Sequence, residues 1–299
     1  MKATSFVATF VLFFLFSVEG FAQQLPEHSQ YMYDPFIVNP AVAGSKSYFP
    51  LLASYRNQWT GFADNPKTML LSMHGELKKN ISVGGIIFSD KTGPTSRTGL
   101  VAAYSYHLPV GKNTLAFGLS MMGFRYSLDK SKLTTDLPDP AIQGEVVQKI
   151  VPEATFGMFY WGKNYYAGFA APQLIQMRVD IGGSEVLNRM VRHYFLTGGY
   201  KFAFSDYAVE PSFLVKATAA APVQFDINSR FYYKEIAWLG LSYRNQESVV
   251  LMFGGKKDIY ALGYSYDITL SDIKNYSTGS HEIFLSVDLF KKKQKASFE

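Results

Sequence analysis

The sequence predicts an all-β fold: a transmembrane outer-membrane β-barrel of about 14 antiparallel strands, with short periplasmic turns and longer extracellular loops. Three observations predict it. Apolar residues alternate with polar or small ones, the non-apolar face is small rather than charged, and the connections are alternately short and long. A soluble sheet shows water a charged face, whereas a barrel in lipid turns its apolar residues outward and its small and polar residues inward.

The chain opens with the pattern of a secretory signal peptide. Lys2 supplies a positive charge, residues 6–17 are mostly apolar, and residues 20–22 offer a cleavage point before Gln23. The apolar run is too short to span a bilayer comfortably as a helix, and no run of about 18 apolar residues follows it. We therefore expect residues 1–22 to be removed during export to the Gram-negative outer membrane.

Residues 23–47 precede the first predicted strand and do not form one regular element. Pro35, Pro40 and Gly44 interrupt the segment, because proline cannot continue a helix or sit in a central strand. The segment is predicted to be either a periplasmic lead-in or a plug in the barrel lumen.

Residues 48–290 carry the alternation and form the predicted barrel. The pattern is clearest at residues 239–244 and 260–267, where one face is aromatic or aliphatic and the other is small or polar. In the fifth strand the apolar positions change parity between Met121 and Met122, which predicts a β-bulge. The fourteen predicted strands are 48–59, 67–78, 82–89, 97–108, 113–128, 152–161, 164–174, 192–204, 207–216, 224–233, 236–246, 248–255, 258–267 and 280–290.

The connections between these strands support the same layout. With both termini in the periplasm, every second connection is a short turn, as at residues 162–163, and the longest loops, 129–151 and 175–191, lie on the other side. Glu247 is an exception, because it alone connects two strands on the side of the long loops. Residues 291–299 are predicted to be a basic periplasmic tail.

The pentapeptide Ser-Tyr-Arg-Asn-Gln occurs twice, at residues 54–58 and 242–246. Both copies fall at the outer end of an upward strand, where the tyrosine faces lipid and Arg56 or Arg244 faces the lumen. We expect the same local role at two positions of the rim, and the alternative is coincidence in a chain rich in these residues.

Other candidates lie at the rim and in the lumen. Trp59 and Trp161 fit the interface zones that aromatic residues favour. Asp90 and Lys91 belong to a predicted outer loop whose turn residues favour a fixed shape. The candidate lumen or partner-binding residues are Arg56, Trp59, Asp90, Lys91, Asp226, Arg230 and Arg244. Pairing among the lumen charges predicts a closed lumen, with a polar passage or docking cavity as the alternative.

No pattern of residues predicts catalysis. The chain has five histidines, none at zinc-ligand spacing, no cysteine, and no nucleophile elbow or phosphate loop. Ser72 and His74 share one strand face, but that spacing is common in strands. We therefore predict no enzyme activity, metal or cofactor. The net charge of +5 comes with no basic helix or groove pattern, which argues against nucleic acid as a partner.

Several stretches closely resemble the PorP/SprF family of Bacteroidetes outer-membrane proteins. The N-terminal stretch follows the family pattern Q-Y-M-x-x-P-x-x-x-N-P-A-x-A-G. The matching residues are Gln30, Tyr31, Met32, Pro35, Asn39, Pro40, Ala41, Ala43 and Gly44. Further matches are Tyr55–Phe62 followed by Pro66 and Thr68, Val83–Pro94 and Ser280–Phe290. The resemblance runs along essentially the whole mature chain.

The resemblance implies a non-enzymatic component of the type IX secretion and gliding machinery. Its implied partners are a large secreted cell-surface adhesin, or the C-terminal region of that adhesin, type IX components and the lipid bilayer. Whether the role lies in secretion or in surface attachment stays open. Residues 39–44 also resemble the N-terminal hatch of the long-chain fatty-acid transporters, which favours as an alternative a transporter for small hydrophobic molecules.

Overall fold

The computed structural model describes residues 26–133, 146–178, 190–219 and 221–290. The predicted signal peptide and the predicted basic tail, residues 1–22 and 291–299, lie outside the described residues. Within the described part, no helix is long and apolar enough to cross a membrane. The helical elements there are five short 3-10 turns: η1 (Ser29–Met32), η2 (Pro35–Ile37), η3 (Pro40–Val42), η4 (Lys130–Lys132) and η5 (Asp272–Asn275).

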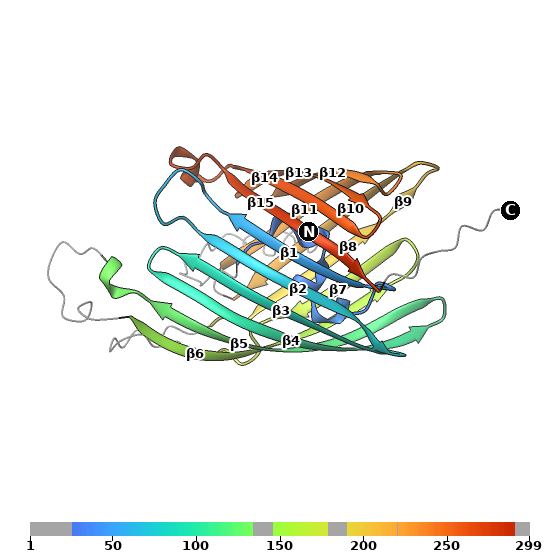
Figure 1. Ribbon diagram of the computed structural model, residues 1–299, viewed down its shortest axis with the longest axis horizontal. Coiled ribbons are helices and arrows are strands. Elements are labelled where there is room, and N and C mark those ends of the chain that lie inside the picture. The colour runs from blue at the N-terminus through green and yellow to red at the C-terminus, as the bar shows by residue number, and fades with distance from the viewer. Residues whose placement is uncertain (1–25, 134–145, 179–189, 220, 291–299) are drawn as a thin grey trace, which may run out of the picture.

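The described residues form one closed antiparallel barrel (Figure 1). Its paired segments are β1 (Phe49–Asn57), β2 (Lys67–Lys78), β3 (Ile81–Thr92), β4 (Thr95–Val110), β5 (Asn113–Leu128), β6 (Val147–Trp161), β7 (Tyr165–Ala171), β8 (His193–Tyr200), β9 (Phe202–Ala203), β10 (Tyr207–Thr218), β11 (Ala221–Tyr233), β12 (Ala237–Arg244), β13 (Ser248–Lys257), β14 (Tyr260–Thr269) and β15 (Ser280–Leu289). Because β9 continues β8 after a break at Lys201 and both pair with β10, the described segments make 14 strands. The predicted fold class is confirmed.

The barrel closes where the first strand meets the last. β1 pairs with β15 from Phe49 opposite Leu289 to Asn57 opposite His281, and β10 pairs with β11 on the far side. Closure leaves no unpaired sheet edge, which is the condition for a strand-built structure to survive in lipid. In barrels of this kind the short turns face the periplasm, so the end with the short turns is called the periplasmic end below and the other the extracellular end.

The two faces of each strand have different chemistry, as β12 shows. Leu239 and Leu241 point outward with 62% and 52% of their surface exposed, whereas Ser242 and Arg244 point inward and are buried. Alternation of this kind places an apolar outer wall against acyl chains and a polar inner wall around the lumen.

The predicted β-bulge in the fifth strand is wrong. The register of β5 with β4 and with β6 runs through Met121 and Met122 without a shift. The parity of apolar residues changes because Phe124 and Tyr126 face inward, where they pack with Val151 in an apolar cluster. An aromatic residue inside the lumen produces the same sequence pattern as a bulge.

The predicted outer loop at residues 90–96 is also wrong. β3 continues to Thr92 and β4 begins at Thr95, so Gly93 and Pro94 alone connect them. Gly93 has a φ of +56°, a value that glycine adopts without steric cost. The two strands therefore form a hairpin that extends beyond the length predicted for either strand.

Trp161 does not belong to the outward aromatic zone. Its ring packs against the rings of Phe159 and His107, with ring centroids 5.3 and 5.2 Å away. All three side chains face the lumen, so Trp161 contributes to the interior near the periplasmic end.

Candidate functional site

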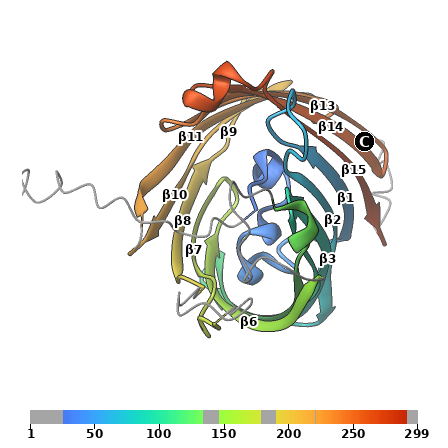
Figure 2. The same ribbon diagram turned by 90° about the vertical axis from the view of Figure 1, so that its left-hand side faces the viewer.

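Residues 26–47, called the lumenal segment below, lie inside the barrel. Figure 2 looks along the barrel and shows the three blue 3-10 turns of this segment surrounded by strands. Pro35 and Pro40 each open a turn, where the missing amide proton costs nothing. Asn39 caps η3, because its side-chain oxygen accepts the N–H of Ala41 at 3.0 Å. The family-pattern prolines and asparagine thus fix the local shape of the segment.

Glycines on the inward face of the strands make room for the lumenal segment. A Cβ atom on Gly118 would lie 2.3 Å from the backbone nitrogen of Ala41, and one on Gly157 would lie 2.1 Å from Oδ1 of Asn39. Asn39 also donates to the carbonyl oxygen of Met158 at 2.9 Å. The backbone of η3 therefore rests directly on strands β5 and β6.

Asp34 joins the lumenal segment to β2. It accepts hydrogen bonds from Ser72 Oγ at 2.8 Å and from His74 Nε2 at 3.2 Å. His74 Nδ1 accepts the N–H of Gly44 at 3.2 Å, which leaves its proton on Nε2, toward Asp34. Burial raises the pKa of Asp34, but the contacts with His74, Lys46 and Ser72 together outweigh burial and bring the pKa to about 2. Ser72 and His74 hold the segment, and His74 is not placed to activate the Ser72 hydroxyl.

A buried polar cluster holds the first turn of the lumenal segment. Arg56 Nη2 contacts Asp267 Oδ2 at 2.7 Å, and Arg56 Nη1 donates to Ser29 Oγ at 2.8 Å. The N–H of Ser29 donates to Glu282 Oε2 at 2.7 Å. Arg56, Asp267 and Glu282 are each at most 2% exposed, so the cluster replaces water for all three charges.

Arg244 gathers further carboxylates next to this cluster. Its Nη1 atom lies 3.1 Å from Glu27 Oε2 and 3.2 Å from Glu247 Oε1, and its Nε atom lies 3.6 Å from Asp226 Oδ1. Burial raises the pKa of Glu27, yet Arg244 and Lys216 together bring that pKa well below its usual value. Burial and the hydrogen bond with Glu27 raise the pKa of Glu247 to about 8. The pKa values of the two carboxyl groups thus shift in opposite directions, which favours the proton on Glu247 over Glu27.

Arg230 lies on the inner wall of β11. Its Nη2 atom contacts Glu210 Oε1 at 2.8 Å, and Tyr232 donates to the other oxygen of Glu210 at 3.0 Å. On the same strand, Asn228 donates to the hydroxyl of Tyr31 at 2.9 Å. The inward face predicted for this strand thus contacts the lumenal segment directly.

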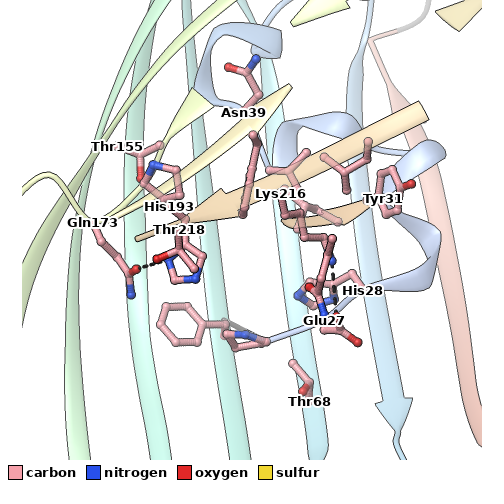
Figure 3. Close-up of a pocket in the computed structure, with 18 of the residues that line it drawn as sticks. Glu27, His28, Tyr31, Asn39, Thr68, Thr155, Gln173, His193, Lys216 and Thr218 are labelled. Carbon is pink, nitrogen blue, oxygen red and sulfur yellow. Dashed lines mark hydrogen bonds and ion pairs between the residues drawn. The ribbon is translucent and has the colours of Figure 1, made fainter. Parts of the chain in front are cut away.

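A cavity of about 620 Å³ lies on the extracellular side of the lumenal segment. Figure 3 shows Glu27 paired with Lys216 on one side of it and His193 paired with Gln173 on the other. Much of its wall is apolar: Leu70, Ile86, Phe88, Val101, Met122, Phe124, Phe195 and Leu214. Trp59, Gln246 and Ser271 line it from the outer loops, so the cavity extends toward the extracellular end.

The seven candidate residues do not form one site. Arg56, Asp226, Arg230 and Arg244 face the lumen and pair with buried partners, and Trp59 lines the cavity. Asp90 faces inward and accepts the hydroxyl of Thr68 at 2.8 Å, whereas Lys91 is exposed on the outer wall.

Three residues of the buried polar clusters are not among those that the sequence predicts. Ser29, Asp34 and Glu282 contribute as much to the polar clusters as the predicted residues do. Glu282 alternates with apolar residues on β15, and an inward carboxylate on a lipid-flanked strand is a signal that requires a buried cation. Ser29 and Asp34 carry no comparable signal, because neither lies on a strand.

Comparisons with known proteins agree with this architecture. The family model described as type IX secretion system membrane protein PorP/SprF matches residues 20–287. No curated protein matches the sequence.

Among solved structures, the chain is similar to the CymD monoaromatic hydrocarbon channel, with 12% identity over 88% of this chain and 92% of that chain and a TM-score of 0.50. It is also similar to a FadL homologue from Pseudomonas aeruginosa, with 9% identity over 88% and 95% of the two chains and a TM-score of 0.49. At 12% identity, the likeness to the CymD channel shows the barrel fold alone.

Proposed function

Because the chain belongs to the PorP/SprF family of type IX secretion system membrane proteins, we propose that it is a non-enzymatic outer-membrane barrel that supports secretion or surface attachment of a large adhesin. The proposed partners are the adhesin, or its C-terminal region, and periplasmic components of the secretion and gliding machinery. The lipid bilayer is the third partner, through the apolar outer wall.

One structural observation supports a holding role. Ion pairs and hydrogen bonds from β1, β2, β12, β14 and β15 fix the lumenal segment across the barrel, and the cavity lies above it. A partner segment that enters from the extracellular end meets the floor formed by Phe36–Pro40. A cavity closed on its periplasmic side retains a bound partner segment at the cell surface. Passage of a substrate through the barrel requires residues 36–40 to move aside.

The test places a photocrosslinking amino acid at each end of the barrel. Gln246 and Asp272 lie in outer loops, and Lys79 and Lys163 lie in short turns of the opposite end. All four side chains are exposed, so substitution leaves the interior intact. Crosslinks formed in living cells are identified by mass spectrometry after purification in mild detergent.

The two ends report on the two proposed roles. Crosslinks from Gln246 or Asp272 to a large surface protein support attachment, and crosslinks from Lys79 or Lys163 to a periplasmic type IX component support a role in secretion. If neither end crosslinks to a secreted protein or to a type IX component, the proposal fails.

The apolar wall of the cavity favours transport of small hydrophobic molecules as a second candidate. Leu70, Ile86 and Phe88 offer a surface on which an apolar molecule loses contact with water. In that case the lumenal segment is a hatch, and uptake of a radiolabelled hydrophobic compound requires it to move. An introduced pair of cysteines that forms a disulfide between the lumenal segment and β2 distinguishes transport from attachment. The disulfide is expected to stop transport, while attachment of an adhesin continues.

A further inference from the structure

The outer wall of the barrel carries a one-sided basic surface at the extracellular end. Lys67 on β2, Lys91 on β3 and Arg125 on β5 point outward and are exposed. Neither these three residues nor Lys132 in η4 makes an ion pair within the part of the chain that the structure describes. Lys67 is adjacent to Lys91, and Lys91, Arg125 and Lys132 line a common recess with the carboxylate of Asp129.

The strand register places two of these cations face to face. Lys67 is directly opposite Lys91 across β2 and β3, and like charges at opposite positions repel. The same row continues through Ser96, Ser127 and Gln148 on the next three strands. A bound anion converts this repulsion into attraction.

The second row adds hydroxyl groups and the third cation. Ser89 lies opposite Thr98, and Thr98 lies opposite Arg125. A surface recess of about 400 Å³ is lined by Lys132 and by six residues of the two rows: Lys91, Ser96, Thr98, Arg125, Ser127 and Gln148. Lys67 lies beside it, opposite Lys91. The carboxylate of Asp129 lines the same recess and offsets part of its positive charge, while its Oδ1 atom accepts from the hydroxyl and the N–H of Ser131.

The next row toward the membrane is apolar. Leu71, Ile87 and Leu100 point outward at neighbouring positions, with 42%, 60% and 59% of their surfaces exposed. Adjacent rows therefore differ sharply: one carries hydroxyl groups and a cation, and the next carries aliphatic side chains. The basic surface thus lies at the level where acyl chains give way to lipid headgroups.

The other side of the barrel does not share this pattern. At the extracellular ends of β11 to β15 the outward residues include Phe225, Tyr243, Val249, Ile268 and Ile283, which are aromatic or aliphatic. β4, β5 and β6, with 16, 16 and 15 residues, are the longest described strands. The row of Lys91, Ser96, Ser127 and Gln148 lies one position from the extracellular ends of β3 to β6.

We propose that Lys67, Lys91, Arg125 and Lys132 bind the phosphorylated headgroup of an outer-leaflet glycolipid. Phosphate monoesters on a sugar offer the charge and the acceptor oxygens that the lysines, the arginine and the hydroxyls donate to. The recess faces sideways, continuous with the apolar rows that contact acyl chains. A lipid can place its phosphate in the basic recess and its acyl chains on the apolar rows at the same time. An acidic segment of a soluble protein has no acyl chains to cover the apolar rows.

The test compares a triple variant, Lys67→Gln with Lys91→Gln and Arg125→Gln, with a matched triple variant at the periplasmic end, Lys79→Gln with Lys112→Gln and Lys163→Gln. Both remove three exposed positive charges. Each full-length barrel is placed in phosphatidylcholine nanodiscs, and lipid A, dephosphorylated lipid A or inorganic phosphate is titrated in. Bound lipid A per barrel is measured by native mass spectrometry, and heat-modified gel migration checks folding.

The wild-type barrel and the matched variant are expected to bind lipid A equally. The Lys67, Lys91 and Arg125 variant is expected to bind it about a hundredfold more weakly, because each basic residue near an anionic surface contributes a factor of about five. Dephosphorylated lipid A is expected to bind all three barrels alike. The single Lys91→Glu variant should show the same direction of change if the triple variant folds poorly.

Four outcomes overturn the proposal. Equal binding of lipid A by all three barrels removes the site, and equal weakening in both triple variants shows a general effect of charge. Full displacement of lipid A by inorganic phosphate shows a site for free anions rather than for a lipid. Crosslinking of Lys91 to an adhesin, with lipid A binding unchanged in the triple variant, assigns the surface to a protein partner instead.

Discussion

Arg56 and Arg244, the arginines of the two Ser-Tyr-Arg-Asn-Gln copies, converge on one carboxylate oxygen. Asp267 Oδ2 lies 2.7 Å from Nη2 of Arg56 and 3.8 Å from Nη1 of Arg244. In both copies the tyrosine faces outward, with 36% of Tyr55 and 42% of Tyr243 exposed. The two copies of the pentapeptide thus have a common structural role, because each turns an arginine toward the same buried cluster from opposite sides of β14.

Removal of Arg56 is expected to release the lumenal segment. Arg56→Gln leaves Asp267 without its nearest cation and Glu282 without a cation 3.5 Å away, and an unpaired buried charge costs about 3–5 kcal/mol. Since the chain has no cysteine, a Met32→Cys background gives a single buried reporter. We expect its maleimide labelling in folded barrels to accelerate about a hundredfold or more.

The control for this change is Arg125→Gln, which removes an exposed arginine from the outer wall. Its labelling rate at position 32 should equal that of the parent. An unchanged rate in Arg56→Gln contradicts the assignment of Arg56 as an anchor of the lumenal segment.

The strand glycines offer a steric test of the same contact. A Cβ atom on Gly118 meets backbone atoms of the lumenal segment, the nearest at 2.3 Å, whereas one on Gly123 of the same strand meets nothing within 4 Å. Gly118→Ala is therefore expected to weaken the seating of η3 by about 1–3 kcal/mol, the usual cost of overpacking. Labelling of Met32→Cys should rise in Gly118→Ala and stay constant in Gly123→Ala, with heat-modified migration unchanged in both. Equal rates in the two alanine variants count against close backbone contact at β5.

The alternation of residues was sufficient to predict the barrel because lipid imposes it on each strand. β2 and β5 have the predicted limits, Lys67–Lys78 and Asn113–Leu128. Apart from the hairpin at Gly93 and Pro94, the errors occur where the interior departs from small and polar residues. Phe124 and Trp161 face inward because the lumenal segment fills only part of the lumen and apolar clusters fill other parts, and no periodicity distinguishes them from lipid-facing residues.

The candidate site was predictable only in part, for a related reason. The sequence predicts Arg56 and Arg244 in the lumen because each follows a lipid-facing tyrosine on an alternating strand. Their partners lie far away in sequence: Asp267 is 211 residues from Arg56, and Glu27 is 217 residues from Arg244. Such pairings depend on the circumference of the closed barrel, which single-strand patterns do not contain.

The orientation of the barrel is testable with single cysteines. Gln246→Cys lies at the loop end and Lys163→Cys in a short turn at the other end, and both positions are exposed. A membrane-impermeant maleimide added to intact cells is expected to label Gln246→Cys and to label Lys163→Cys only after permeabilisation. The reverse labelling pattern contradicts the proposed role at the cell surface, because the cavity then opens toward the periplasm.

The carboxyl pair of Glu27 and Glu247 predicts how pH acts on the lumenal segment. The pKa of Glu247 is raised from its usual 4.5 to about 8, so its contribution to stability is fully present below pH 4.5 and is lost as the pH rises to about 8. The pKa of Glu27 is lowered, so its contribution is present above pH 4.5 and is lost as the pH falls. Between about pH 6 and about pH 8, Glu27 stays ionised in the folded barrel while Glu247 loses its proton. In this range, therefore, ionisation of Glu247 loosens the lumenal segment.

Met32→Cys labelling, normalised to the unfolded chain at each pH, should thus accelerate over that range and level off above about pH 8. In Glu247→Gln the amide donates a hydrogen bond to Glu27 at every pH, so the normalised rate should stay flat across the same range. The second comparison is Glu210→Gln, which removes a buried carboxylate from the Arg230 pair and should keep the pH dependence of the parent. If the acceleration persists in Glu247→Gln, another group controls the segment, and the proton on Glu247 has no part in holding it.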